Sequence, residues 1–130
     1  MTPPDFTLTV DLPAAPARLF DAWISGPGHA EMTGAPATSE PTVGGAFTAW
    51  DGYIEGTWTA LDRPRRVVMA WRTSEFGDAP DAQVEVTFEP TETGARLTLT
   101  QSGSPADQAD GYRQGWEDYY FTPMRSWLTG

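Results

Sequence analysis

From about residue 37 to residue 103, short runs of alternating apolar and polar residues follow one another, separated by turn sequences. QVEVTFE (83–89) and ARLTLTQ (95–101) alternate most regularly, which is typical of strands with one buried face. Asp51-Gly52 lies between two such runs and is the dipeptide that most favours a β-hairpin turn. Because successive strands joined by short turns must be antiparallel neighbours, this segment predicts an antiparallel sheet.

Helical patterns stand on both sides of this strand-rich segment. FTLTVDL (6–12) predicts a first strand, ARLFDAWI (17–24) a helix, and HAEMT (29–33) one further short turn. SPAD (104–107) has the N-cap serine and first-turn proline of a helix that could extend to about residue 128. A sheet with one polar face must cover its other face, and this long helix is the largest cover available. We therefore predict an α+β fold in which a curved antiparallel sheet of about seven strands wraps around the C-terminal helix, with short helices after the first strand.

The C-terminal helix carries many aromatic residues within GYRQGWEDYYFTPMRSWL (111–128). At 100° per residue, one face spanning roughly 100° collects most of them. That face holds Tyr112, Trp116, Tyr119, Tyr120, Pro123 and Trp127, whereas Phe121, Met124 and Leu128 lie off it. Pro123 cannot donate a hydrogen bond to the carbonyl of Tyr119, so we expect a kink and an available carbonyl acceptor there.

Composition narrows the class of protein. A chain of 130 residues is large enough for one domain with its own core, so we predict a single domain over residues 1–130. Eighteen acidic residues against eight arginines give a net charge of −10, which opposes binding to nucleic acid and to anionic membrane surfaces. No apolar run approaches the ~18 residues of a membrane span, and MTPPDFTLTV does not resemble a secretory signal. Since cysteine is absent as well, the sequence predicts a cytoplasmic protein.

The sequence contains few side chains arranged for catalysis, metal binding or phosphate binding. His29 is the only histidine, and we interpret it as a surface or cap residue. Carboxylates such as Glu55 and Glu85 alternate with inward apolar residues and should be solvated, so no acid pair lies in an apolar setting. The glycines of SGPG (25–28) and VGG (43–45) lack the spacing of a phosphate-binding loop. We expect no cofactor, no metal site and no catalytic residues.

Seven segments of the chain follow the order and spacing of a known family. They are APAT (35–38), VGGAF (43–47), WDGYIEGTW (50–58), RRVVMAWR (65–72), VEVTFEP (84–90), ARLTLTQSG (95–103) and GWEDYYFTPM (115–124). The chain resembles the domain homologous to the C-terminal part of the Hsp90 ATPase activator, within the START-like and Bet v 1-like superfamily. The resemblance implies a helix-grip fold that encloses an apolar cavity. It also implies varied activities, because some members bind lipids, hormones or polyketides, a minority are enzymes, and the eukaryotic namesake assists a chaperone.

Aromatic residues of the sheet and the helix form the candidate site. Large rings that meet across a curved sheet leave gaps more readily than aliphatic side chains, and buried tyrosine hydroxyls need partners. We therefore expect a small hydrophobic or aromatic ligand to bind between the two walls. The sheet wall comprises Phe47, Trp58, Met69, Trp71 and Phe88, the helix wall Trp116, Tyr119 and Tyr120, and the entrance His29 and Met32.

Three alternatives remain open beside this hypothesis. The aromatic residues could fill a close-packed core without a cavity. The domain could be a partner of an Hsp90-type chaperone, as the resemblance implies, and would then use an outer surface. It could also be an enzyme that holds a polar group deep in its cavity.

Overall fold

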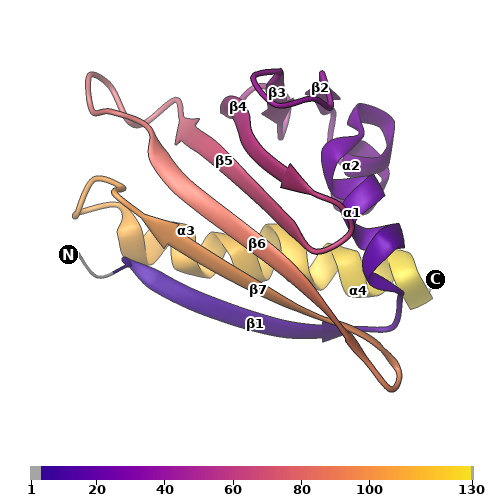
Figure 1. Cartoon of the computed structure of the whole chain (residues 1–130). Coiled ribbons are helices and arrows are strands. Elements are labelled where there is room, and N and C mark those ends of the chain that lie inside the picture. The colour runs from indigo at the N-terminus through magenta and orange to yellow at the C-terminus, as the bar shows by residue number, and fades with distance from the viewer. Residues whose placement is uncertain (1–3, 130) are drawn as a thin grey trace.

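An antiparallel sheet and a long C-terminal helix make up most of the structure, and Figure 1 shows the helix crossing behind the sheet. The computed structural model describes residues 4–129. The seven strands lie in the order β1-β7-β6-β5-β4-β3-β2, so the first and last strands are neighbours at one edge. This arrangement confirms the predicted α+β class. The elements are β1 (Phe6–Leu12), α1 (Pro16–Ile24), α2 (Gly26–Thr33), β2 (Thr38–Ser39), β3 (Ala46–Ala49), β4 (Ile54–Asp62), β5 (Arg66–Thr73), β6 (Ala82–Thr91), β7 (Gly94–Ser102), α3 (Ala109–Trp116), η1 (Glu117–Phe121) and α4 (Thr122–Thr129).

Alternating side chains build the sheet side of the core, as the sequence predicts. In β1 every second residue is buried, beginning with Phe6. In the β6–β7 pair, Val86 lies opposite Leu99 and Phe88 opposite Leu97, and all four are fully buried. Phe88 also contacts Phe20 and Trp23 of α1, and because burial of apolar surface contributes roughly 25 cal/mol per Å², these rows help to hold the sheet and α1 together.

The predicted turn at Asp51-Gly52 lies in the loop between β3 and β4, where Ala49 pairs with Ile54. The loop contains Trp50 as well, and all three residues have positive φ: 51° at Trp50, 57° at Asp51 and 89° at Gly52. Glycine adopts this conformation freely, but a bulky residue such as tryptophan rarely does. The hairpin prediction is confirmed, and Trp50 is its strained member.

Two short helices follow the first strand. Helix α1 begins at Pro16 and buries Leu19, Phe20 and Trp23 against the sheet. Ser25 then caps α2, because its Oγ accepts a hydrogen bond from the backbone N–H of Gly28 at 3.1 Å. The turn predicted over residues 29–33 is therefore a longer helix that begins at Gly26.

The C-terminal helix begins at Ala109 rather than near Ser104, so its predicted start is wrong. Ser104 serves a tertiary contact instead of a helix cap. Its backbone N–H and its hydroxyl both donate to the carboxylate of Asp5, and the amide of Gln101 donates to its Oγ at 3.1 Å. These bonds join the end of β7 to the chain just before β1.

A π-helical turn, η1, lies in the C-terminal helix immediately before α4. Its bond runs from the N–H of Thr122 to the carbonyl of Glu117, five residues back. Pro123 follows directly, and a proline ring clashes with the carbonyl four residues before it in a regular α-helix. The irregularity expected at Pro123 is thus present as a widened turn that ends just before the proline.

The π turn changes which side chains face the core. It holds one residue more than an α turn, so it rotates the residues after it by about 100°. Phe121 and Met124, which the regular wheel places off the aromatic face, are fully buried. Tyr119, which the wheel places on that face, is 57% exposed. The predicted face is therefore correct for Tyr112, Trp116 and Tyr120 but wrong for Tyr119 and Phe121 within the π turn and for Met124 after it.

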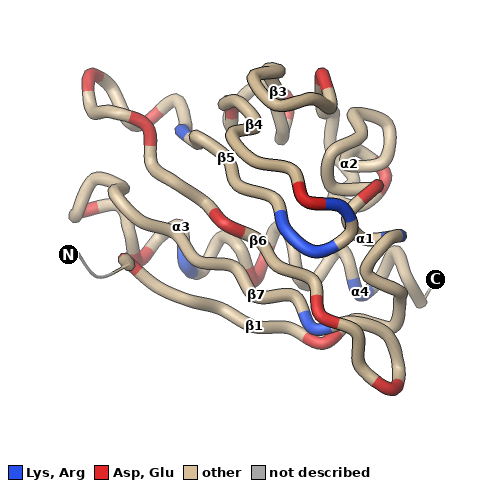
Figure 2. The backbone as a smooth tube through the Cα atoms, in the orientation of Figure 1, with Lys and Arg blue, Asp and Glu red and all other residues tan. Residues whose placement is uncertain are grey.

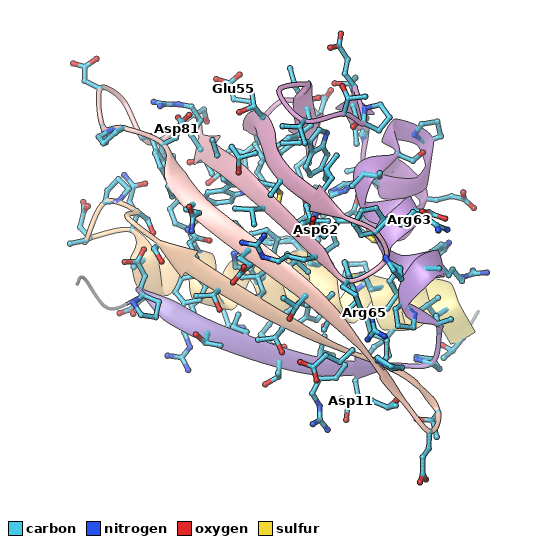
Figure 3. All side chains as sticks on the ribbon, viewed as in Figure 1. Asp11, Glu55, Asp62, Arg63, Arg65 and Asp81 are labelled. Carbon is cyan, nitrogen blue, oxygen red and sulfur yellow. The ribbon has the colours of Figure 1, made fainter. Side chains whose placement is uncertain are left out.

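Charged side chains lie on the outside, and Figure 2 shows acidic residues spread over most elements. Figure 3 places Asp62, Arg63 and Arg65 together at the turn between β4 and β5. There Arg63 binds Asp21 of α1 through both carboxylate oxygens, at 2.7 and 2.8 Å. Such exposed pairs contribute little to stability, because water and salt screen them. Within residues 4–129, no helix is long and apolar enough to cross a membrane.

Candidate functional site

A pocket lies between the sheet, the β3–β4 loop and the C-terminal helix, and we call it the aromatic pocket. It has a volume of about 360 Å³. Seven of its ten lining residues are aromatic, and none carries a formal charge. The lining residues are Trp50, Tyr53, Ile54, Trp71, Gly111, Tyr112, Gly115, Trp116, Tyr119 and Tyr120.

Trp71 of β5 lines the pocket from the sheet. Its ring lies edge-on to Tyr112, with centroids 5.1 Å apart, and tilted against Trp116 at 5.6 Å. Trp116 is itself held in place, because its indole N–H donates to the side-chain carbonyl of the buried Gln101 at 2.8 Å. The central rings of the pocket are thus held by packing and by one buried hydrogen bond.

The β3–β4 loop supplies Trp50 and Tyr53. Trp50 meets Tyr119 of η1 edge-on, with centroids 5.3 Å apart, so this pair joins the loop to the helix. The hydroxyl of Tyr53 donates to the carboxylate of Glu75. Burial and this hydrogen bond raise the pKa of Tyr53 to about 12, so its phenol stays protonated at neutral pH.

Helix α3 contributes two glycines and a tyrosine. Gly111 and Gly115 stand one helical turn apart and leave bare backbone in the pocket wall. The hydroxyl of Tyr112 is hydrogen bonded to Thr73 at 2.6 Å and to Gln108 at 2.5 Å. Burial raises the pKa of Tyr112, which therefore remains a neutral polar group beside the cavity.

Tyr120 connects the pocket to a buried histidine. Its hydroxyl lies 2.7 Å from Nε2 of His29, and Nδ1 of His29 lies 2.9 Å from the backbone carbonyl of Trp23. Since a carbonyl can only accept, Nδ1 carries the proton and Nε2 accepts from Tyr120. Burial lowers the pKa of His29 to about 4 and raises that of Tyr120 well above its usual range. Both side chains are therefore neutral at pH 7.

The structure divides the eight residues predicted to bind a ligand into two groups. Trp71, Trp116, Tyr119 and Tyr120 line the aromatic pocket. Phe47, Trp58, Met69 and Phe88 do not, and all four are buried in the core. Phe47 and Trp58 stack on each other with centroids 4.4 Å apart. Strand alternation found the inward face correctly, but it does not tell which inward residues border a cavity.

The residues predicted at the entrance lie elsewhere. His29 is 6% exposed and Met32 fully buried, and neither lines the aromatic pocket. The interpretation of His29 as a surface or cap residue is also wrong. Helix α2 begins earlier than expected and packs both side chains inward, where His29 finds its partners in Trp23 and Tyr120.

The predicted site lacks six of the lining residues: Trp50, Tyr53, Ile54, Gly111, Tyr112 and Gly115. Tyr112 lies on the aromatic face that the helical wheel predicts, and two signals could have found four of the others. Aromatic residues flank the Asp51-Gly52 turn on both sides, so the hairpin carries rings to its tip. The two glycines occur four residues apart inside a predicted helix, where glycine is unfavourable without a specific reason.

Hydrogen bonding and stacking are the chemistry that this pocket offers. Within the described residues 4–129, no three His, Asp or Glu side chains gather as metal ligands would. The ionisable side chains in the wall are all phenols. The arrangement is suited to holding a flat molecule between rings, with a few polar groups to orient it.

A curved antiparallel sheet closed by a C-terminal helix, with a pocket between the two, defines a helix-grip protein. The chain belongs to the family described as Activator of Hsp90 ATPase homolog 1-like protein, which matches residues 13–129. It is 31% identical over 119 residues to the human activator of 90 kDa heat shock protein ATPase homolog 1, and 30% identical to the mouse protein of that name. These matches cover 92% of this chain but 35% of either relative, so the chain spans only part of their length.

Solved structures show the same fold. An HSP90 activator from Plasmodium falciparum superposes with a TM-score of 0.88 at 23% identity, with 95% of each chain covered. An AHSA1-like protein from Aeromonas hydrophila superposes with a TM-score of 0.74 at 17% identity, covering 95% of this chain and 91% of that one. At such identities the likeness confirms the helix-grip fold alone.

Proposed function

We propose that residues 1–130 form one domain that binds a small hydrophobic or aromatic molecule in the aromatic pocket and catalyses no reaction of its own. The volume and the lining of this pocket are the observations that support the proposal. Its volume of about 360 Å³ falls within the range of roughly 300–1,000 Å³ that is usual for small-molecule sites. Its lining of rings with a few hydroxyl groups has the composition of such sites as well.

The two helix glycines support a binding role. Glycine inside a helix is roughly 0.5–1 kcal/mol less favourable than alanine. An added Cβ at Gly111 would meet no atom within 4 Å, and at Gly115 it would meet only Tyr119, at an ordinary 3.8 Å. Close packing therefore requires glycine at neither position. We infer that their role is to keep space open along the helix wall.

The buried pair of His29 and Tyr120 favours binding over catalysis. A general base needs a pKa near the working pH and a free lone pair. Nε2 of His29 already accepts the hydrogen bond of Tyr120, and the pKa of His29 is about 4. Tyr120 holds its proton because burial raises its pKa. Nε2 of His29 therefore has no free lone pair for a substrate, and the hydroxyl of Tyr120 has no free proton, because it already donates to His29.

Filling the pocket tests the proposal directly. N-phenyl-1-naphthylamine is a suitable probe, because it is neutral and fluoresces when it enters an apolar site. We expect the wild-type protein to bind it with shifts of backbone NMR signals at the pocket residues. Gly115→Leu should weaken binding at least tenfold by occupying the space. Gln114→Leu is the matched control, since Gln114 is exposed on the same helix and does not line the pocket.

Two results would contradict the proposal. One is the absence of any shift at pocket residues with this probe and with a panel of other hydrophobic ligands. The other is an equal loss of binding in Gly115→Leu and Gln114→Leu, which would place the probe elsewhere.

A second candidate function is a role as partner of an Hsp90-type chaperone, favoured by the 31% identity to the human activator. Such a partner would use the outer surface and would not need the pocket. Pull-down and ATPase assays with the Hsp90-type protein of the same host test it. Stimulation that is unchanged in Gly115→Leu would support this role, and the absence of both binding and stimulation would exclude it.

A further inference from the structure

The aromatic pocket is rich in rings and has no basic residue in its described lining. Seven of its ten lining residues are aromatic. The faces of aromatic rings carry partial negative charge, and a cation within about 6 Å of a ring centroid is attracted to them. A pocket of about 360 Å³ is small enough that a cation held inside it lies close to several of these rings.

The lining rings pack against one another at an angle. Trp50 meets Tyr119 at 71° and Trp71 meets Tyr112 at 86°, both edge-on, and Trp71 is tilted by 34° against Trp116. None of the contacts recorded among the described lining rings is a parallel stack. The rings of the pocket therefore do not cover one another face to face, and a ligand can approach ring faces as well as ring edges.

A carboxylate lies beside this group of rings. Tyr53 donates its hydroxyl hydrogen to the carboxylate of Glu75, and the side chain of Gln108 bonds both the backbone carbonyl of Glu75, at 2.9 Å, and the hydroxyl of Tyr112. Burial chiefly, and the negative charge of Glu75 in addition, raise the pKa of Tyr53 and of Tyr112. The field of this carboxylate thus reaches the wall of the pocket.

Two arginines follow lining residues directly in the sequence, and neither lines the pocket. Arg72, after Trp71, binds the carboxylate of Asp81 at 2.8 Å, so its charge is already paired. Arg113, after Tyr112, is exposed on α3. An anionic ligand would lose hydration in the pocket and gain no cation there, whereas a cation would gain both the ring faces and the nearby carboxylate.

From these observations we infer that the aromatic pocket prefers organic cations, in which an apolar body carries a quaternary ammonium group, over neutral molecules of the same shape and over anions. This inference rests on the proposed function and names its ligand class. A quaternary ammonium group suits such a wall because it has no N–H to satisfy and presents methyl groups to the rings. The ring faces supply the attraction, and Glu75 supplies a negative charge at one end.

Three probes of similar size separate charge from shape: phenyltrimethylammonium, tert-butylbenzene and 2-methyl-2-phenylpropanoate. The second has a carbon in place of the charged nitrogen of the first, and the third has a carboxylate in place of one methyl group of the second. Displacement of N-phenyl-1-naphthylamine and NMR titration measure their affinities. We expect the cation to bind about tenfold more tightly than tert-butylbenzene, and the anion at least tenfold more weakly than tert-butylbenzene.

Removing the charge of Glu75 tests its part in this preference. Glu75→Gln keeps an acceptor for Tyr53 but loses the carboxylate, so it should weaken binding of phenyltrimethylammonium about threefold and leave that of tert-butylbenzene unchanged. Glu92→Gln is the matched control, because it changes the net charge equally but lies exposed in the turn between β6 and β7 and does not line the pocket.

Fluorinated tryptophan gives a readout that a purely structural role of the rings would not change. Three of the six tryptophans line the pocket. Biosynthetic replacement of tryptophan by 5-fluorotryptophan withdraws electron density from the ring faces and alters ring shape little. The affinity for phenyltrimethylammonium should fall by a factor of about two to three, whereas that for tert-butylbenzene should stay the same.

The possible results separate this inference from the proposed function. If tert-butylbenzene binds in the pocket as tightly as phenyltrimethylammonium, or the carboxylate binds as tightly as either, the inference is wrong and the proposed function stands. The same holds if Glu75→Gln and fluorination change the affinities for the cation and for tert-butylbenzene equally. If none of the three probes and no N-phenyl-1-naphthylamine binds the folded wild-type protein, both fail.

Discussion

A buried hydrogen bond between His29 and Tyr120 joins the short helix α2 to the C-terminal helix. The pair lies 91 positions apart in sequence and 2.7 Å apart in space. It is surrounded by rings, since Trp23 contacts His29 edge-on at 5.4 Å between centroids and Tyr120 at 5.2 Å. At the scale of the residue, a polar group is tolerated here because both nitrogens of the imidazole have partners.

This contact predicts a pH dependence of stability. The folded pKa of His29 is about 4, below the unfolded value of 6.5, so the unfolded chain binds more protons between these values. The free energy of unfolding should therefore fall as the pH drops from about 6.5 to 4, by on the order of 2–3 kcal/mol. Urea denaturation across this range measures it. In His29→Gln, which cannot take up the proton, the free energy of unfolding should depend little on pH above pH 5. An unchanged pH dependence in this variant would show that other groups cause it.

At the scale of the element, the C-terminal helix combines features that oppose regular helix formation. It contains two glycines at the pocket and a π turn before Pro123. Packing outweighs these local costs, because Trp116, Tyr120 and Phe121 are buried against the rest of the protein. The element is therefore shaped by tertiary contacts and by the pocket more than by helix propensity.

The glycines of α3 should be replaceable at a gain in stability. Because an added Cβ at Gly111 or Gly115 meets open space or an ordinary contact, Gly111→Ala and Gly115→Ala should each raise the free energy of unfolding by about 0.5–1 kcal/mol. Chemical denaturation measures this. Gly56→Ala is the contrasting variant, because its Cβ would lie 1.9 Å from the carbonyl oxygen of Ala70, and it should destabilise. Loss of stability in both helix variants would mean that the helix needs these glycines for packing.

At the scale of the whole molecule, net charge opposes folding. The chain carries −10, and its ion pairs, such as Arg96 with Asp11 at 2.9 Å, lie on the surface where each contributes little. Repulsion among the remaining acidic groups acts over about 10 Å at 0.1 M salt and over longer distances in more dilute buffer.

Salt should therefore stabilise this protein. Raising NaCl from 10 to 200 mM is expected to increase Tm by about 2–5 °C, equivalent to roughly 1 kcal/mol. Differential scanning calorimetry provides the measurement. Tetramethylammonium chloride at the same ionic strength should raise Tm as much as NaCl does, because screening depends on ionic strength and not on the kind of cation. A decrease of Tm with salt would show that the surface ion pairs dominate instead.

Local patterns in the sequence were sufficient for most of the architecture. Period-two alternation located the inward rows of β6 and β7, and Asp51-Gly52 located the hairpin. These predictions succeed because each depends on neighbouring residues and on one buried face. Net charge and the absence of cysteine are likewise properties of the sequence alone.

Tertiary structure decided the rest. Ser104 donates a hydrogen bond to Asp5 instead of capping a helix. Phe121 faces inward because of a π turn, which a regular helical wheel does not include. Tertiary structure also brought Trp50 to the helix and His29 to Tyr120, and so separated the residues that line the pocket from those that fill the core. Periodicity determines which way a side chain faces, but whether a cavity lies in front of it depends on how elements distant in sequence meet.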